Sequence, residues 1–207
     1  FYSPVVEAVA RIPTQDLRMS AEAAKVRLSA LGFHDEDAGL RHIEALTSGT
    51  SRAVRIQTAL MPAMLAWLAD GPSPDHGLLA FRQVSEALGE SPWYLRALRD
   101  EGAMAQRLAV VLSTSRYAVD VLTRAPETVQ VLVDDDLTPL SREDLARQMN
   151  AVARRHHDVE EAVGAIRAVR RRELFRILVA DILNVTGIRR IGPVSYTHLR
   201  AHETRGN

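Results

Sequence analysis

Asp134-Asp135-Asp136 is the part of this chain whose residue types and spacing come nearest to a catalytic motif. It contains an Asp-x-Asp, and two such carboxylates can chelate Mg²⁺ against the phosphates of a nucleotide. That chemistry also needs a Gly-rich turn some residues earlier and a strand to hold the carboxylates, and the sequence before Asp134 predicts neither. We therefore interpret the triplet as a solvated helix end rather than as a metal site.

The histidines are the next candidates for chemistry. His156 and His157 are adjacent, and neighbours on a helix point about 100° apart, so the pair cannot easily bind one ion and is interpreted as a helix junction. His42 and His76 are single histidines in amphipathic segments, where a polar-face or capping role is expected. No Ser/His/Asp set has a recognisable nucleophile turn. We assign no catalytic, cofactor-binding or metal-binding residue in this chain.

The sharpest cluster of positive charge is Arg167 together with Arg170–Arg172. A nucleic-acid surface would use such residues. Because Glu160, Glu161 and Glu173 lie nearby, we expect i,i+3 and i,i+4 ion pairs instead, on a helix surface that is solvated or faces another domain.

The amino-acid composition limits the classes of partner that this protein is expected to bind. The chain has 207 residues, in which 26 Lys and Arg balance 26 Asp and Glu. Zero net charge provides no whole-chain positive field, so neither nucleic acid nor a membrane is an expected partner. Cysteine is absent, which excludes disulfides and thiolate chemistry and fits a cytoplasmic protein. The apolar run 60–69 is interrupted by Pro62, and no run reaches the roughly 20 residues that span a bilayer.

Apolar residues recur at helical spacing along most of the chain, which predicts an all-α fold, an irregular multi-helix bundle. Ser20, Asp35 and Ser51 are expected N-caps, Gly32 is an expected helix stop, and Pro62 must kink or break the helix that follows Ser51. Helices are also expected over 21–31, 35–49, 78–88, from Ser91-Pro92 onward, and over 103–112, 116–124, 127–133, 142–156 and 159–185.

The helix after Ser51 carries one apolar stripe, formed by Ile56, Leu60, Met64, Trp67 and Leu68. Trp67, Trp93 and Tyr94 lie in such stripes rather than among interleaved basic residues, so they are expected to be core anchors and not platforms for base stacking. The β-branched run 129–133 is the one weak strand signal, and its helical context outweighs it.

Several separate segments of this sequence resemble one known family. They are Ser85–Glu127, Phe1-Tyr2-Ser3-Pro4, Arg41–Leu46 and Arg170–Leu174. Together they are similar to the central region of the bifunctional glutamine synthetase adenylyltransferase/adenylyl-removing enzymes, in their actinobacterial form. The resemblance covers about residues 1–187.

The resemblance implies a parent enzyme that transfers AMP from ATP to a tyrosine of glutamine synthetase and removes it by phosphorolysis. Such an enzyme regulates nitrogen assimilation under the control of a PII signalling protein and glutamine, with ATP and Mg²⁺ as cofactors. The family has two nucleotidyltransferase domains, and none of their catalytic motif occurs in this chain. The fragment alone is therefore expected to be inactive, as a helical connector between the two catalytic halves.

The resemblance also implies a domain organisation. Residues 1–13 would end the adenylyl-removing half, 14–133 would form a helical bundle, 134–141 a linker, and 142–187 long helices leading to the adenylyltransferase domain. Residues 193–204 look like a translated sequencing adapter, so 188–207 is interpreted as a non-native tail. His198 and His202 in that tail have the i,i+4 spacing of some zinc sites but lack a third ligand.

The sequence alone leaves two other functions open. The chain could be a free-standing α-helical module that binds another protein through an apolar groove, which a start codon just before Phe1 would support. It could also be a helical nucleic-acid binder that uses the arginines of 167–172, in which case binding would weaken steeply with salt. Zero net charge argues against the latter.

Overall fold

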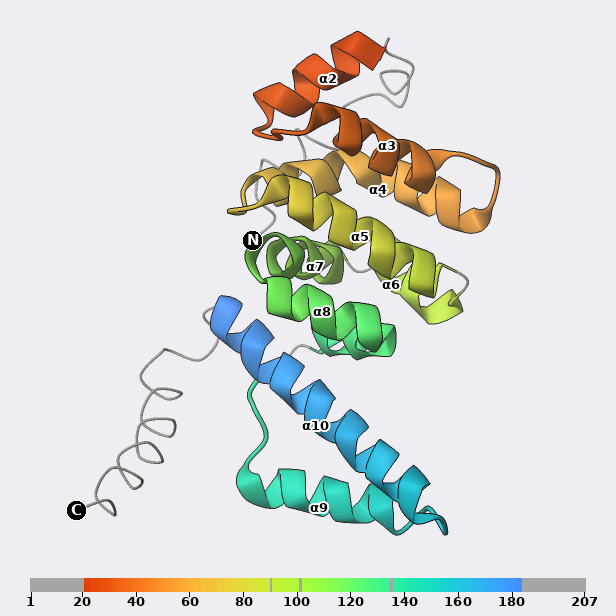
Figure 1. Cartoon of the computed structure of the whole chain (residues 1–207), viewed down its shortest axis with the longest axis vertical. Helices are drawn as coiled ribbons and strands as arrows, with labels where there is room; N and C mark the ends of the chain where they lie inside the picture. The colour runs from red at the N-terminus through yellow and green to blue at the C-terminus, as the bar shows by residue number, and fades with distance from the viewer. Residues whose placement is uncertain (1–20, 90, 101, 135, 184–207) are drawn as a thin grey trace, which may run out of the picture. The chain divides into compact units, whose positions relative to one another are not determined.

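The computed structural model describes residues 21–183, except 90, 101 and 135 (Figure 1). In these residues every regular element is a helix, which confirms the predicted all-α fold. In chain order the helices are α2 (Ala21–Ala30), α3 (Glu36–Thr47), α4 (Arg52–Ala69), α5 (Pro74–Leu88), α6 (Pro92–Asp100), α7 (Gly102–Thr114), α8 (Arg116–Arg124), the 3-10 helix η2 (Pro126–Val133), α9 (Arg142–Ala153) and α10 (Val159–Ile182).

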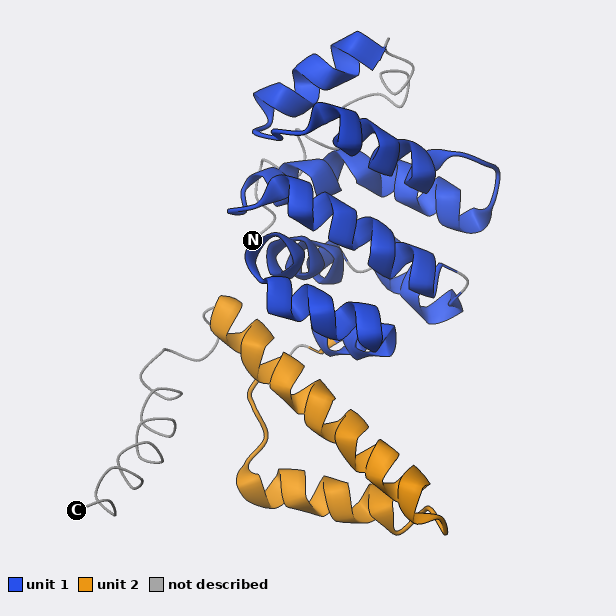
Figure 2. Cartoon of the chain, in the orientation of Figure 1, with its two compact units in different colours: residues 1–133 blue, residues 134–207 orange. Residues whose placement is uncertain are grey.

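The chain divides into two compact units, residues 1–133 and residues 134–207 (Figure 2). The first, unit 1, contains α2 to α8 and η2, and the second, unit 2, contains α9 and α10. None of the described helices is both long and apolar enough to cross a membrane.

Side-chain caps start the helices where the sequence predicts. The carboxylate of Asp35 accepts a hydrogen bond of 2.8 Å from the backbone N–H of Ala38, and the hydroxyl of Ser51 accepts one of 3.2 Å from that of Val54. Gly32 follows α2 with a φ of +94°, a left-handed conformation that suits glycine. Ser20 lies outside the described residues.

Pro62 does not break α4, which runs without interruption from Arg52 to Ala69. Proline removes one backbone donor inside a helix, so its neighbours must hold the helix together. Met61 and Met64 on either side of it are fully buried and supply that anchorage.

The segment predicted as a helix over 127–133 forms a 3-10 helix, Pro126–Val133, rather than an α-helix. Short 3-10 segments of this kind commonly connect α-helices, and this one is fixed by its tertiary contacts. Val129 and Leu132 are fully buried, and Arg107 donates a hydrogen bond of 3.0 Å to the carbonyl of Leu132.

The core of unit 1 surrounds α5, which packs against α3, α4, α7, α8 and η2. Gly77 on α5 allows the closest of these approaches: a β-carbon there would lie 2.7 Å from Leu68 Cδ2 and 3.1 Å from Ser113 Cα. Tyr94 is fully buried, and Trp93 meets it edge to face with ring centroids 5.9 Å apart. Tyr94 is thus a core anchor, whereas Trp67 and Trp93 are only half-buried.

Asp75, in the first turn of α5, ties that helix to the turn before α3. Its carboxylate accepts hydrogen bonds of 3.1 Å from the backbone N–H of His34 and of Asp35. Burial raises the pKa of Asp75, but these two donors outweigh it and hold the pKa below its ordinary value.

In unit 2, two side chains of α10 hold the segment that precedes α9. Glu173 is 5% exposed, and its carboxylate accepts a hydrogen bond of 2.6 Å from the backbone N–H of Leu140. Arg176 pairs with the carboxylate of Asp134 at 2.7 Å and donates to the carbonyl of Asp136 at 2.9 Å. Helix α9 ends at Ala153 and α10 at Ile182, three residues earlier in each case than the predicted 156 and 185.

Candidate functional site

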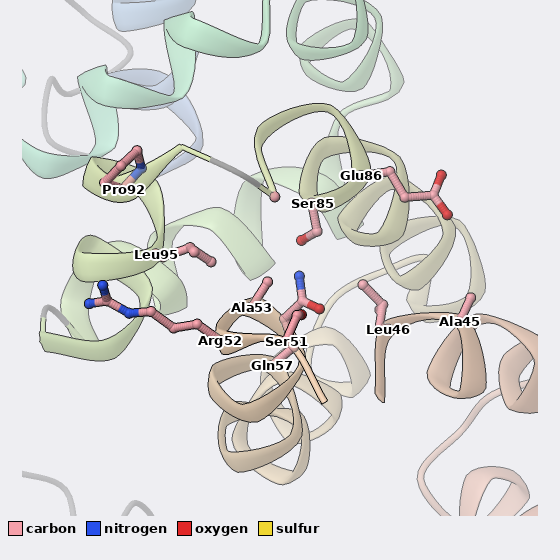
Figure 3. A pocket seen from close by; sticks show the side chains of 11 residues that line it. Ala45, Leu46, Ser51, Arg52, Ala53, Gln57, Ser85, Glu86, Pro92 and Leu95 are labelled. Carbon is pink, nitrogen blue, oxygen red and sulfur yellow. The ribbon is translucent and has the colours of Figure 1, made fainter. Parts of the chain in front are cut away.

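The best candidate for a binding site is a cavity of about 470 Å³ in unit 1, where α3, α4, α5 and α6 meet (Figure 3). Its walls are mostly apolar or small. They are formed by Ala45, Leu46, Ser51, Arg52, Ala53, Gln57, Ser85, Glu86, Gly89, Pro92 and Leu95.

Gln57 is the unusual residue of this cavity. It lies on the buried face of α4 and is only 5% exposed, and its side chain lines the cavity. Figure 3 shows the amide directed into the cavity, towards the side of Ser85. A buried polar group is normally paired because leaving it unpaired is costly. Because the amide opens onto the cavity, it is placed to hydrogen-bond a group that enters it (Figure 3).

Behind the cavity, Ser85 and Tyr94 form a buried pair. Their hydroxyl oxygens are 3.1 Å apart, and both side chains are almost fully buried. Burial raises the pKa of the Tyr94 phenol well above its ordinary value, despite the hydrogen bond with Ser85, so the phenol stays neutral. The pair forms a fixed polar wall rather than an acid or a base.

Arg52 and Glu86 bring opposite charges to the edge of the cavity, and their side chains point away from each other (Figure 3). Glu86 is engaged, because Arg82 donates a hydrogen bond of 2.6 Å to its carboxylate. Arg82 also lies 3.3 Å from the Nδ1 atom of His42. Arg52 has no ion pair among the described residues.

A second cavity, also of about 470 Å³, shares Arg52 with the first. Three arginines surround an apolar floor in it, and its lining is Arg52, Arg55, Ile56, Ala59, Leu60, Leu98 and Arg99. Arg99 makes two hydrogen bonds to Asp100, at 2.5 and 2.6 Å. These bonds lower the pKa of Asp100, and the charges of Arg99, Arg52 and Arg96 lower it further, although desolvation opposes them. The potential at this cavity therefore favours carboxylates.

Two residues of the acidic triplet, Asp134 and Asp136, are described, and each already has a partner; Asp135 lies outside the described residues. The carboxylate of Asp134 faces Arg176, and that of Asp136 accepts a hydrogen bond of 2.8 Å from the backbone N–H of Thr138, which lowers its pKa. Across the described residues no group of three or more His, Asp or Glu could hold a metal ion.

The described histidines are not brought together. His42 is held by Arg82, and burial, followed by the charges of Arg82 and Arg41, lowers its pKa. His76 is in the first turn of α5, where its Nε2 atom is buried without a hydrogen-bond partner. His156 and His157 lie between α9 and α10, and His156 Nδ1 is 3.3 Å from Glu161. His198 and His202 fall outside the described residues.

Arginines 167, 170, 171 and 172 are all exposed on α10, but the expected ion pairs are not formed in the described residues. The carboxylate of Glu173 instead contacts the backbone N–H of Leu140 and the side chain of Arg176, and the carboxylate of Glu161 lies beside His156. Glu160 and Glu161 precede Arg167 by seven and six residues, which is too far for an i,i+3 or i,i+4 pair.

Sequence reasoning missed both cavities, because the apolar stripe predicted for α4 was only partly right: Met64 and Leu68 are buried, but Ile56, Leu60 and Trp67 are not. The residues of α4 that are buried are Gln57, Met61, Met64 and Leu68. Ile56 and Leu60 are only half-buried and belong to the floor of the second cavity. The available signal was Gln57, a polar residue four positions before Met61 and seven before Met64, where a helical core position is expected.

Comparison with known proteins gives a consistent result. The sequence model of the glutamate-ammonia ligase adenylyltransferase family matches residues 105–197. The chain is 52% identical over 190 residues to the bifunctional glutamine synthetase adenylyltransferase/adenylyl-removing enzyme of Streptomyces coelicolor, which covers 90% of this chain and 19% of that enzyme. Enzymes of the same name from Nocardia farcinica and Mycolicibacterium smegmatis are 47% and 44% identical, over 89% and 91% of this chain and 19% of each enzyme. No solved structure matches the chain.

The family match continues past Gly187 to residue 197, so the resemblance extends further than expected. It enters the segment 188–207, whose foreign origin stays a prediction. The chain spans about a fifth of the length of the curated relatives named above. Over 90% of its own length, the chain therefore matches one segment of the bifunctional glutamine synthetase adenylyltransferase/adenylyl-removing enzymes, which confirms the family resemblance of its motifs.

Proposed function

We propose that this chain is a helical connector within an enzyme that transfers AMP from ATP to a tyrosine of glutamine synthetase and removes it by phosphorolysis. The observation that carries the proposal is the similarity over 190 residues to 19% of an enzyme named for both activities. The rest of the enzyme would hold the two nucleotidyl-transfer sites. The chain itself would have no active site.

ATP and Mg²⁺ would be the cofactors of those two sites. The described residues of this chain do not fit a Mg²⁺-nucleotide site. Asp134 is neutralised by Arg176 at 2.7 Å, and no Gly-rich turn precedes it to hold phosphates. No catalytic step is therefore assigned to this chain. Glutamine synthetase would be the protein substrate, and a PII signalling protein with glutamine would regulate the enzyme.

The work of the connector would be mechanical. Unit 1 has a continuous core around α5 with many fully buried side chains, so it should move as a body rather than bend smoothly. Unit 2 starts with a segment that Glu173 and Arg176 fix to α10, so the chain enters α9 from a defined position. Such a connector can favour one of two active sites, because a displacement at one end of a rigid body reaches the other end.

The test is to remove residues 35–133 from the full-length enzyme and to measure both activities. We expect the two halves to keep catalytic activity when assayed with saturating substrates, because the proposal places both sites elsewhere. The response of one activity to effectors of the other should disappear, because the proposed coupling runs through this segment.

Two results would oppose the proposal. If both activities and their effector responses are unchanged, the segment is not a connector. If the catalytic step itself is lost while the two halves stay folded by circular dichroism, the chain contributes residues to an active site.

A further inference from the structure

The two cavities of unit 1 are neighbours: residues of α4 and α6 line both, and Arg52 belongs to both. We propose that this α4–α6 face is a docking surface for an acidic segment of a partner protein, with an apolar side chain in the second cavity and its main chain at Gln57. The proposal goes beyond the connector role and does not depend on it.

The charge of the face indicates an acidic partner. Arg52, Arg55, Arg96 and Arg99 are exposed there, while the described acidic residues nearby, Asp100 and Glu86, are each already bonded to an arginine. Arg99 is already paired with Asp100, whereas Arg52 and Arg55 have no ion pair among the described residues. Two carboxylates of a partner could therefore pair with Arg52 and Arg55 without displacing an existing bond.

The floor of the second cavity indicates an apolar anchor between those carboxylates. Ile56 and Leu60 are half-buried, and with Ala59 and Leu98 they form a surface on which an apolar side chain can be buried. Its lining contains no aromatic residue on which a base could stack. This combination favours a peptide over a nucleic acid.

Gln57 provides the second reason to choose a peptide. A carboxamide offers both a donor and an acceptor, and the N–H and C=O groups of a peptide main chain match both. A phosphate would leave the carboxamide oxygen unpaired because it offers acceptors only. Gln57 is 5% exposed, and its amide points into the first cavity, towards the side of Ser85 (Figure 3).

The experiment is fluorescence anisotropy on the 207-residue chain with a labelled 12-residue peptide, in which glutamates flank two leucines. Three further probes are the same peptide with glutamine in place of glutamate, the same peptide with serine in place of leucine, and a 12-nucleotide single-stranded DNA. We expect saturable binding of the acidic peptide that weakens about tenfold or more when its glutamates or its leucines are replaced, and that weakens as salt is raised.

The charge variant is the double substitution Arg52→Glu with Arg55→Glu. Its matched control is Arg167→Glu with Arg170→Glu, which makes the same change of charge at exposed positions of α10. We expect the first pair to weaken peptide binding by about tenfold or more and the control to change it by about twofold or less.

Gln57→Leu tests the amide, with Gln106→Leu as a control at an exposed position of α7. We expect Gln57→Leu to weaken binding of the peptide about fivefold. The variant should unfold at an equal or higher urea concentration than the wild type, which separates an effect on binding from an effect on folding.

The absence of saturable peptide binding overturns the proposal, and so does equal binding by the charge variant and its control. Tighter binding of the DNA than of the acidic peptide would assign the face to nucleic acid instead. If Gln57→Leu bound the peptide as tightly as the wild type, the peptide main chain would not lie at Gln57 in the first cavity.

Discussion

Replacing Gln57 by leucine should stabilise unit 1, although it changes a residue that lines the candidate site. The residue is 5% exposed, and its amide opens onto the first cavity (Figure 3). A leucine has a similar volume and would continue the buried face that Met61, Met64 and Leu68 form on α4. The substitution therefore removes a polar group from a largely buried position and leaves the packing of the helix in place.

The size of the effect follows from the two environments. An unpaired buried amide costs about 1–3 kcal/mol in proteins, and the lower end applies here because the amide opens onto a cavity that water can enter. We expect the free energy of unfolding to rise by about 1 kcal/mol, which raises the melting temperature by roughly 3–6 °C for a unit of this size. Gln106→Leu, at an exposed position of α7, should change it by less than about 0.5 kcal/mol.

Urea unfolding followed by tryptophan fluorescence measures this directly. The chain has two tryptophans, Trp67 and Trp93, and both belong to unit 1, so the signal is specific for that unit. A fall in stability of more than about 1 kcal/mol for Gln57→Leu would refute the reasoning, because it would mean that the amide makes favourable interactions inside the folded unit.

Four further predictions concern the packing and the polar contacts. Gly77→Ala should lower the free energy of unfolding by about 1–3 kcal/mol in the same fluorescence assay, because its β-carbon would lie 2.7 Å from a core side chain, whereas Gly164→Ala, in open space on α10, should raise stability by up to about 1 kcal/mol in calorimetry. Asp75→Asn should cost about 1 kcal/mol at pH 7. Because the folded-state pKa of Asp75 is lowered, its contribution is present above about pH 4 and lost as pH falls through the folded-state pKa, so the difference between wild type and variant in urea unfolding should shrink as the pH is lowered below about 4. Glu173→Ala should speed hydrogen exchange at the Leu140 amide by about tenfold or more, and an unchanged rate would show that the 2.6 Å bond between them contributes little.

The helices could be predicted from the sequence because their signals are local. Asp35 and Ser51 cap the helices that follow them, and Arg116–Arg124 forms a helix over the predicted residues. The departures occur where tertiary contacts decide. Pro62 stays inside a continuous α4 because buried methionines on both sides hold it, and the segment at 127–133 takes the 3-10 form.

The candidate site could not be predicted in the same way. Its cavities are bounded by residues that are far apart in the sequence. No local pattern therefore indicates that Leu46, Gln57, Ser85 and Leu95 line one cavity. Periodicity was ambiguous on α4, because Ile56 and Leu60 fit one apolar stripe and Met61 fits another. The family resemblance could be recognised from the sequence because it rests on segments of that sequence and does not depend on how the helices pack.

The most direct test of the connector proposal is an exchange of segments. The aligned fifth of the Streptomyces coelicolor enzyme, 52% identical to this chain, would be replaced by the matching residues of this chain. Incorporation of AMP into glutamine synthetase, and its phosphorolytic removal, would be measured with and without effectors, beside a control chimera that carries an unrelated helical bundle of equal length. The proposal predicts that the first chimera keeps both activities and their reciprocal regulation, while the control keeps activity and loses regulation. If the control chimera is regulated as well as the first, the segment acts only as a spacer and the connector proposal is contradicted.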